Sequence, residues 1–316
     1  MYQLAPIKLL PAFRDYLWGG SRLKTDFNKK TSLTPLAESW ELSAHKAGES
    51  TVAQGPFQGL GLTAYLRVIG SAALGTNAAR FDYFPILIKL IDAKQNLSVQ
   101  VHPDDAFALA NEGEFGKTEM WYVLDCEPGA TLYCGFAKDV TKEEYASAIA
   151  TGSLTNILNR VPVSRGDTFF IPAGTVHAIG AGIVICEIQQ NSNTTYRVFD
   201  YNRRDKSGNT RPLHVEKALA VSNLEKAPAH HKTPNGDNVL LADCPYFNVR
   251  RLVLHGMRVL PVTTDTFISL IITDGQGTLI GKHGVLSFTK GDSLFIPAQN
   301  EEFTLNGEGE IIITTV

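Results

Sequence analysis

An internal repeat constrains the fold of this chain more than any other feature. The segment that begins at Gly166 reads Gly-Asp-Thr-Phe-Phe-Ile-Pro-Ala, and the segment that begins at Gly291 reads Gly-Asp-Ser-Leu-Phe-Ile-Pro-Ala. Six of the eight positions are identical, at an offset of 125 residues. Each copy reads as a Gly-Asp turn, a short apolar strand and a proline stop. The repeat predicts a duplicated all-β unit, with one barrel in each part of the chain.

The remaining sequence fits a mainly β fold because short runs rich in Val, Ile, Phe and Tyr alternate with Gly, Asn and Pro. We expect strands at 85–92, 97–102, 118–126, 168–172, 183–190, 195–201, 246–254, 266–273, 277–280, 292–297 and 309–316. We expect a few short helices at 62–74, 141–151 and 212–222, the second of them with a capping box. The Pro- and Gly-containing stretch 225–237 is the predicted linker. It divides the chain into a catalytic metal-binding domain, 1–228, and a C-terminal domain, 229–316.

Composition excludes several classes of protein. A chain of 316 residues has ample length for a core, and a net charge of −3 offers no basic surface for nucleic acid. No apolar run approaches the roughly 18 residues of a membrane span, and the first residues do not read as a signal peptide. The four cysteines form no Cys-x-x-Cys pair. We therefore expect a cytoplasmic protein with no nucleic-acid or membrane partner; the oligomeric state is open, and a monomer fits.

The segment Ser98-Val-Gln-Val-His holds the first candidate ligands. Side chains alternate between the two faces of a strand, so Ser98, Gln100 and His102 share one face. The next strand opens with Lys117 and Glu119, which again share a face. Either set would also suit a half-exposed strand whose polar residues face water. A carboxylate at the start of an apolar strand is nevertheless a plausible metal ligand.

The third element is Gly-x5-Pro-x-Gly-x2-His, from Gly166 to His177. This spacing resembles the second motif of the cupin superfamily as far as the histidine. The asparagine usual four residues later is replaced by Ala181, and His102 and Glu119 are further apart than in the typical first motif. In the second repeat, Gln299 and Glu302 replace the glycine and the histidine. We therefore expect the C-terminal unit to have lost its metal site.

Gln100, His102, Glu119 and His177 together offer two imidazoles, a carboxylate and an amide oxygen. This set suits zinc with one position left for water or substrate. Manganese, iron and cobalt accept similar ligands, so the ligand set predicts a metal site but does not by itself select zinc among these metals.

A longer series of motifs resembles the type I phosphomannose isomerases, in their short bacterial form. The series is Tyr-Leu-Trp-Gly-Gly from Tyr16, Glu-Ser-Trp-Glu from Glu38, Gln-Val-His-Pro from Gln100, Lys-Thr-Glu-Met-Trp from Lys117, Pro-Ala-Gly-Thr-Val-His from Pro172, and Glu187 to Asp200. The resemblance implies two cupin jelly-roll barrels, one zinc ion per chain, and reversible isomerisation of mannose 6-phosphate to fructose 6-phosphate. It also implies metal ligands at Gln100, His102, Glu119 and His177, an active-site arginine at Arg197, a cavity position for Glu187, and substrate contacts from Lys89, Ser98, Lys117 and Arg197.

These residues make chemical sense in those roles. Aldose–ketose isomerisation places negative charge on the sugar oxygens, which a metal and the Arg197 guanidinium stabilise. Glu187, with Lys117 beside it, is the first candidate for proton transfer, and burial is expected to raise its pKa. A metal-bound water is the alternative. Lys89, inside an apolar strand, needs an anionic ligand or a route to the rim. Arg203 and Arg204 are expected in a solvated turn, with a role in the pocket as the alternative.

Two other functions are compatible with a cupin. One is a different metal-dependent enzyme, such as an iron dioxygenase, which would consume oxygen and has no need of Lys89 or Arg197. The other is a non-catalytic sugar-binding cupin, which is expected to lack Glu119 or Arg197, and this chain keeps both.

Overall fold

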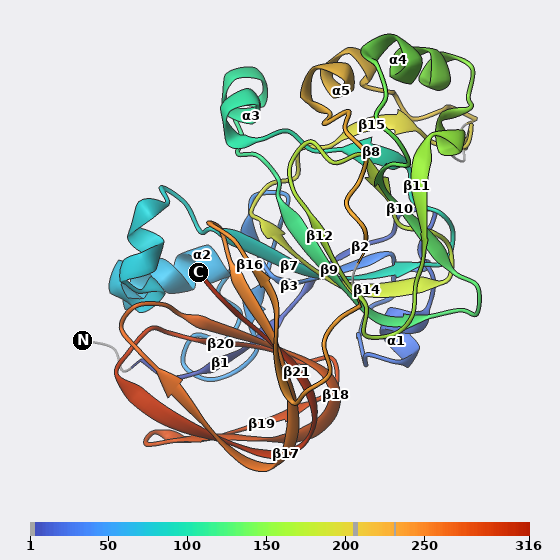
Figure 1. Ribbon diagram of the computed structural model, residues 1–316. Helices are drawn as coiled ribbons and strands as arrows, with labels where there is room; N and C mark the ends of the chain where they lie inside the picture. The colour runs from blue at the N-terminus through green and yellow to red at the C-terminus, as the bar shows by residue number, and fades with distance from the viewer. Residues whose placement is uncertain (1–3, 205–207, 231) are drawn as a thin grey trace.

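The computed structural model describes residues 4–204, 208–230 and 232–316, and three antiparallel sheets dominate it (Figure 1). The six-stranded sheet has the order β12-β9-β14-β7-β3-β2. Its strands are β2 (Ala12–Arg14), β3 (Glu38–Leu42), β7 (Ile86–Ala93), β9 (Glu119–Cys126), β12 (Thr168–Ile171) and β14 (Ile183–Gln190). The five-stranded sheet, in the order β11-β10-β13-β8-β15, contains β8 (Val99–Val101), β10 (Thr131–Phe136), β11 (Leu158–Pro162), β13 (His177–Ala178) and β15 (Tyr196–Phe199).

The eight-stranded sheet lies below these two in Figure 1. It contains β1 (Ile7–Leu10), β6 (Thr51–Val52), β16 (Asn238–Asp243), β17 (Asn248–Val262), β18 (Ile268–Gly281), β19 (Gly284–Thr289), β20 (Ser293–Ile296) and β21 (Glu301–Thr315). A small hairpin pairs β4 (Ala44–His45) with β5 (Gly48–Glu49). The expectation of a mainly β fold with few helices is confirmed.

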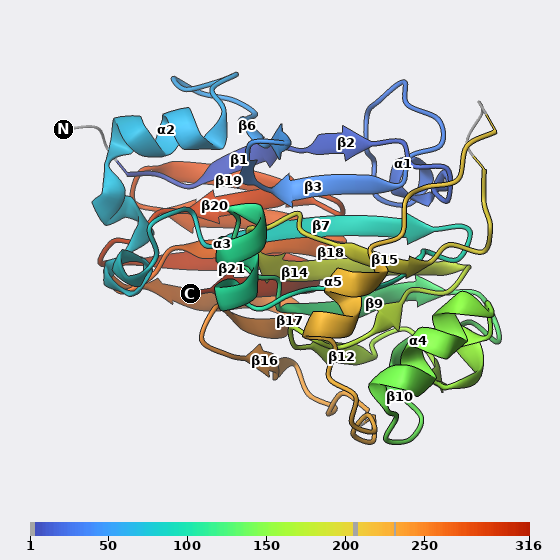
Figure 2. The ribbon, with the colours of Figure 1, turned by 90° about the horizontal axis from the view of Figure 1, so that it is seen from above.

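The helices are short and lie around the sheets (Figure 2). They are α1 (Arg22–Thr25), α2 (Leu62–Ile69), α3 (Asp105–Glu112), α4 (Lys142–Ala150) and α5 (Val215–Val221), with 3-10 turns at Ser71–Leu74, Thr76–Arg80 and Leu154–Asn156. The predicted cap of α4 is present, because Thr141 accepts a hydrogen bond from the backbone N–H of Glu144. No helix in the described ranges is long and apolar enough to cross a membrane.

The two copies of the repeat form the same local structure. Gly166 and Gly291 adopt φ of 88° and 90°, a conformation that favours glycine. The aspartate that follows each glycine accepts a hydrogen bond from the backbone N–H three residues before it, at 2.8 Å for Asp167 and 2.7 Å for Asp292. A four-residue strand then begins in each copy, β12 and β20. The repeat is therefore a repeat of turn geometry as well as of sequence.

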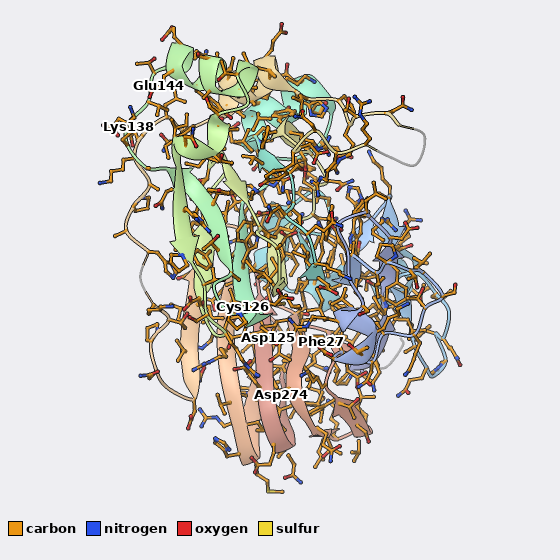
Figure 3. The ribbon with its side chains drawn as sticks, turned by 90° about the vertical axis from the view of Figure 1, so that its right-hand side faces the viewer. Phe27, Asp125, Cys126, Lys138, Glu144 and Asp274 are labelled. Carbon is orange, nitrogen blue, oxygen red and sulfur yellow. The ribbon has the colours of Figure 1, made fainter. Side chains whose placement is uncertain are left out.

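The central strands of the six-stranded sheet are buried on both faces, and every residue of β7 and β14 is buried. One face, with Leu90, Tyr122 and Cys186, packs against residues of the eight-stranded sheet such as Ile312. The opposite face, with Ile91, Trp121 and Ile185, packs toward the five-stranded sheet through residues such as Leu132. Figure 3 shows side chains filling these layers, with Asp125 of β9 above Asp274 of β18 at the boundary.

The N-terminal strands take part in the C-terminal sheet. Strand β1 pairs with β20, and β6 pairs with β1. The described residues of 225–237 form neither helix nor strand. The domain limits 1–228 and 229–316 stay a prediction, and β1 and β6 bind the start of the chain to its last part.

Candidate metal centre and active site

Two rows of polar side chains face each other between the six-stranded and the five-stranded sheets. In the first sheet, neighbouring strands align Trp40 with Lys89, Lys89 with Glu187, and Glu187 with Trp121. In the second sheet, Gln100 lies between its partners Arg197 and His177. These residues come from seven separate strands and meet in one layer.

Three potential metal ligands converge within this layer. His102, Glu119 and His177 are buried, and their ligand atoms all lie within 4.8 Å of one another. Nε2 of His177 is 3.4 Å from Oε1 of Glu119, and Nε2 of His102 is 3.5 Å from Oε2. Among the described residues, Oε1 of Glu119 is buried without a hydrogen-bond partner. A buried carboxylate whose two oxygens each face an imidazole nitrogen is the environment that a divalent metal ion satisfies.

Backbone carbonyls orient both imidazoles. Nδ1 of His102 lies 2.9 Å from the carbonyl oxygen of Thr194, and Nδ1 of His177 lies 2.8 Å from that of Thr175. A carbonyl only accepts, so each Nδ1 carries the proton and donates it, leaving the Nε2 lone pair toward the site. Burial, together with the charge of Lys117, lowers the pKa of His177 to about 4 and that of His102 well below 6.5. Both side chains are therefore neutral at pH 7, the form that binds metal.

Gln100 and Lys117 lie next to this cluster. The amide nitrogen of Gln100 is 3.4 Å from Nε2 of His177. The ammonium of Lys117 is 3.0 Å from Nε2 of His102 and 2.5 Å from Oε2 of Glu119. The predicted set of four ligands is thus brought together, and Lys117 shares its carboxylate.

Glu187 lies between two lysines. Oε1 is 3.2 Å from Nζ of Lys89 and 3.8 Å from Nζ of Lys117, and the indole N–H of Trp121 donates to Oε2 at 3.1 Å. The sequence-based expectation of a raised pKa is wrong for Glu187. Burial alone would raise it, but the charges of Lys117 and Lys89 lower it. Burial and the neighbouring Glu187 instead raise the pKa of Glu119.

Lys89 does not reach the rim. It is 4% exposed, 3.9 Å from Oε2 of Glu38 in addition to its contact with Glu187, and 5.1 Å from the ring centre of Trp40. Burial alone would lower the pKa of Lys89, but these two carboxylates raise it. Two acidic partners therefore explain this buried lysine, and Glu38 is the partner that we did not assign from the sequence.

Arg197 reaches the same space from β15. Its Nε donates to Oγ of Ser98 at 3.3 Å, and Nη1 donates to the carbonyl oxygen of Pro212 at 3.1 Å. Arg197 and Ser98 line a cavity of about 270 Å³, and further lining residues include Gln100, Lys89, Lys117, Glu187, Glu38, Tyr16, Trp18 and Arg211. Every substrate-contacting residue predicted from the sequence lines this cavity. A cavity of this size suits a small polar molecule such as a sugar phosphate.

Arg203 and Arg204 are not simply in a solvated turn. Both line a second cavity of about 230 Å³, which shares Tyr16, Trp18 and Arg211 with the first. Arg203 is bound to the buried carboxylate of Asp200. This cluster could have been recognised in the sequence. A short stretch of a dozen residues contains Asp200, Arg203, Arg204 and Arg211.

The histidine of the predicted linker that the structure describes lies against β12. His230, in the predicted linker, stacks on Phe169 with ring centres 4.1 Å apart, and His231 lies outside the described residues. Gln299 lines a different cavity with residues such as Gly75.

Comparison with known proteins identifies relatives along the whole chain. Residues 7–125 match the family model for the catalytic domain of type I phosphomannose isomerase, and residues 238–316 match that for the cupin domain of mannose-6-phosphate isomerase. Mannose-6-phosphate isomerase ManA of Bacillus subtilis is 37% identical, with 98% of each chain covered. The mannose-6-phosphate isomerase of Streptococcus mutans is 36% identical over 97% of each chain.

Solved structures agree with these relatives. The crystal structure of the mannose 6-phosphate isomerase from Bacillus subtilis superposes with a TM-score of 0.90 at 33% identity, and the match covers 99% of this chain and 100% of that one. The chain belongs to the type I phosphomannose isomerase family.

Proposed function

We propose that this chain interconverts mannose 6-phosphate and fructose 6-phosphate with one zinc ion bound by His102, Glu119, His177 and Gln100. The observation that carries the proposal is the convergence of two neutral imidazoles on one buried carboxylate that has an unsatisfied oxygen, in a chain whose full-length relatives are mannose-6-phosphate isomerases. A bound zinc ion would supply Lewis-acid stabilisation of the charge that develops on the sugar oxygens. The neutral, carbonyl-oriented histidines and the carboxylate suit zinc among the divalent metals.

Glu187 is the group that we assign to proton transfer. The reaction moves a proton from C2 of the aldose to C1, while the hydroxyl proton passes between the oxygens at these carbons. A carboxylate whose pKa is lowered by Lys117 and Lys89 is ionised at neutral pH and is able to accept the proton from C2. Returning that proton to C1 restores the carboxylate. A positioned general base of this kind contributes about 10²–10⁴-fold.

Arg197 and the two lysines contribute charge. The Arg197 guanidinium, held by Ser98 and the carbonyl of Pro212, is fixed beside Gln100 and faces the cavity. A fixed cation there stabilises the enediolate without reorganising during the reaction. Lys117, between Glu119 and Glu187, holds these two carboxylates in place.

The finer architecture supports the same assignment. The repeated turn in front of β12 and β20 is what two related jelly-roll units would share, and we infer a cupin barrel in each part of the chain. The alternatives of an oxygen-using cupin and a non-catalytic sugar-binding cupin are not favoured by relatives that cover 98% of the chain.

A coupled assay tests the proposal. Fructose 6-phosphate formed from mannose 6-phosphate is measured with chelator-stripped protein, before and after addition of zinc, manganese or cobalt. Turnover restored by zinc is the expected result, and unphosphorylated mannose serves as the comparison substrate. A folded protein that shows no turnover with any of these metals would refute the assignment.

A further inference from the structure

A phosphoryl group carries about two negative charges near neutral pH and needs cations that are not already neutralised. The family resemblance points to Lys89 and Lys117 as substrate contacts. In the structure these two lysines face three buried carboxylates, those of Glu38, Glu119 and Glu187. The acidic groups outnumber the ammonium groups there, so both lysines are already neutralised by carboxylates of the protein.

The opposite balance holds around Asp200. This carboxylate is 6% exposed and binds two guanidiniums at once. Arg211 makes a two-pronged contact, with Nε 2.8 Å from Oδ2 and Nη2 2.6 Å from Oδ1. Arg203 donates to Oδ1 at 3.0 Å through Nε and to the carbonyl oxygen of Asn96 at 2.6 Å through Nη1. One carboxylate thus fixes two cations, and a positive charge is left over.

Arg211 is the member of this cluster that faces the reaction space. It lines both the cavity that contains Glu187 and Gln100 and the neighbouring cavity lined by Arg203 and Arg204. Its fork to Asp200 uses Nε and Nη2, so the N–H groups of Nη1 remain to donate to a ligand. A guanidinium held in this way loses little further entropy when it binds an anion.

We propose that Arg211 binds the phosphoryl group of the substrate, with Asp200 as the residue that positions it and Arg203 adding charge. The proposal rests on the proposed function, since it assigns one end of the same cavity. The phosphate is then directed to the arginine side, while the metal ligands and Glu187 are left for C1 and C2. Lys89 and Lys117 form ion pairs with the buried carboxylates and do not bind the phosphate.

The test separates phosphate binding from turnover. Sorbitol 6-phosphate and sorbitol lack a carbonyl group and are not isomerised, so calorimetry with zinc-loaded protein measures their binding alone. Arg211→Gln and Arg211→Lys are compared with Arg165→Gln, an exposed arginine 3.6 Å from Asp274 at the boundary between the sheets. Asp200 keeps Arg203 as a partner in the Arg211 variants, so their fold is expected to persist.

We expect Arg211→Gln to weaken sorbitol 6-phosphate binding about 10- to 100-fold, as for loss of a hydrogen bond between charged groups. The affinity for sorbitol should be unchanged. The affinity of Arg211→Lys for sorbitol 6-phosphate should lie between those of the wild type and Arg211→Gln, because lysine keeps the charge but lacks the two-pronged guanidinium. Asp200→Asn should raise the KM for mannose 6-phosphate about tenfold with kcat within about threefold, whereas a merely structural role would lower the melting temperature and leave KM alone. Arg165→Gln should match the wild type.

Two outcomes would overturn the phosphate site. They are a change of less than about threefold in Arg211→Gln and absence of sorbitol 6-phosphate binding by the wild type. If binding depends on Arg211 but mannose 6-phosphate is not turned over, the phosphate site stands and the proposed reaction falls.

Discussion

Replacing Lys89 by methionine is expected to destabilise the protein severely. Nζ of Lys89 lies 3.2 Å from Glu187 and 3.9 Å from Glu38, and its side chain is only 6% exposed. Methionine fills a similar volume, so the main effect is the loss of a charge that two buried carboxylates share. Removal of one partner from a buried ion pair costs about 3–5 kcal/mol, because the remaining charge is left uncompensated.

Lys46→Met is the matched control. Lys46 forms a shorter ion pair, 2.6 Å from Glu114, but its side chain is 77% exposed. Exposed pairs contribute about 0–1 kcal/mol, so burial and not distance should decide the outcome. The free energy of unfolding is measured by urea titration of both zinc-loaded variants and the wild type, from the midpoint and the slope m.

A second substitution sharpens the test. Glu187→Gln removes one of the two carboxylates that Lys89→Met would leave unpaired, so the double variant should lose less stability than the two single variants together. The reasoning is refuted if Lys89→Met costs no more than Lys46→Met, or if the double variant shows simple additivity. Either result would mean that water or rearrangement compensates Glu38 and Glu187 in this layer.

Three further predictions concern the metal and the reaction. His177→Ala should abolish stoichiometric zinc measured by elemental analysis, while the control His255→Ala, at an exposed position, should retain it. Arg197→Ala should keep zinc and its circular dichroism spectrum while kcat falls about 10²–10³-fold, as for loss of a charge-stabilising donor; near-normal turnover would contradict its role. Burial and the charge of Glu187 raise the pKa of Glu119, whereas the pKa of His177 is lowered to about 4. Zinc binding at about pH 5–6 should therefore displace about one proton, which comes from the carboxyl group of Glu119. Affinity should therefore rise with pH up to neutrality, and calorimetry in buffers of different ionisation enthalpy that finds two displaced protons would indicate that the histidines titrate.

Local periodicity made much of the site predictable. The alternation of side chains along a strand is rigid, so Ser98 and Gln100 were expected on one face, and both line the cavity. The spacing from Gly166 to His177 includes a local turn, in which the backbone N–H of Thr175 donates to the carbonyl oxygen of Pro172. The cap of α4 follows equally from Thr141 and Glu144.

Features that depend on pairing between distant strands were not predictable from the sequence. The lowered pKa of Glu187 follows from alignment of β14 with β7, which places Lys89 directly opposite, almost a hundred residues away. Glycines in the C-terminal part also caused a wrong prediction of strand boundaries. Gly275 adopts φ of 80°, and β18 continues past it with a register shift, where two separate strands were expected. A glycine inside a strand often marks such a bulge, and only the partner strand reveals it.

Because the central strands of the six-stranded sheet are buried on both faces, the folding of the site depends on the C-terminal strands. Lys89 and Glu187 point to the reaction space, but their chain neighbours Leu90 and Cys186 point the other way, into the core shared with the C-terminal strands. A gene fragment that encodes only the catalytic half would expose that apolar face to water, and its product would be expected to aggregate. Selection on catalysis therefore also acts on the packing residues of the last eighty positions, although none of them lines the reaction cavity.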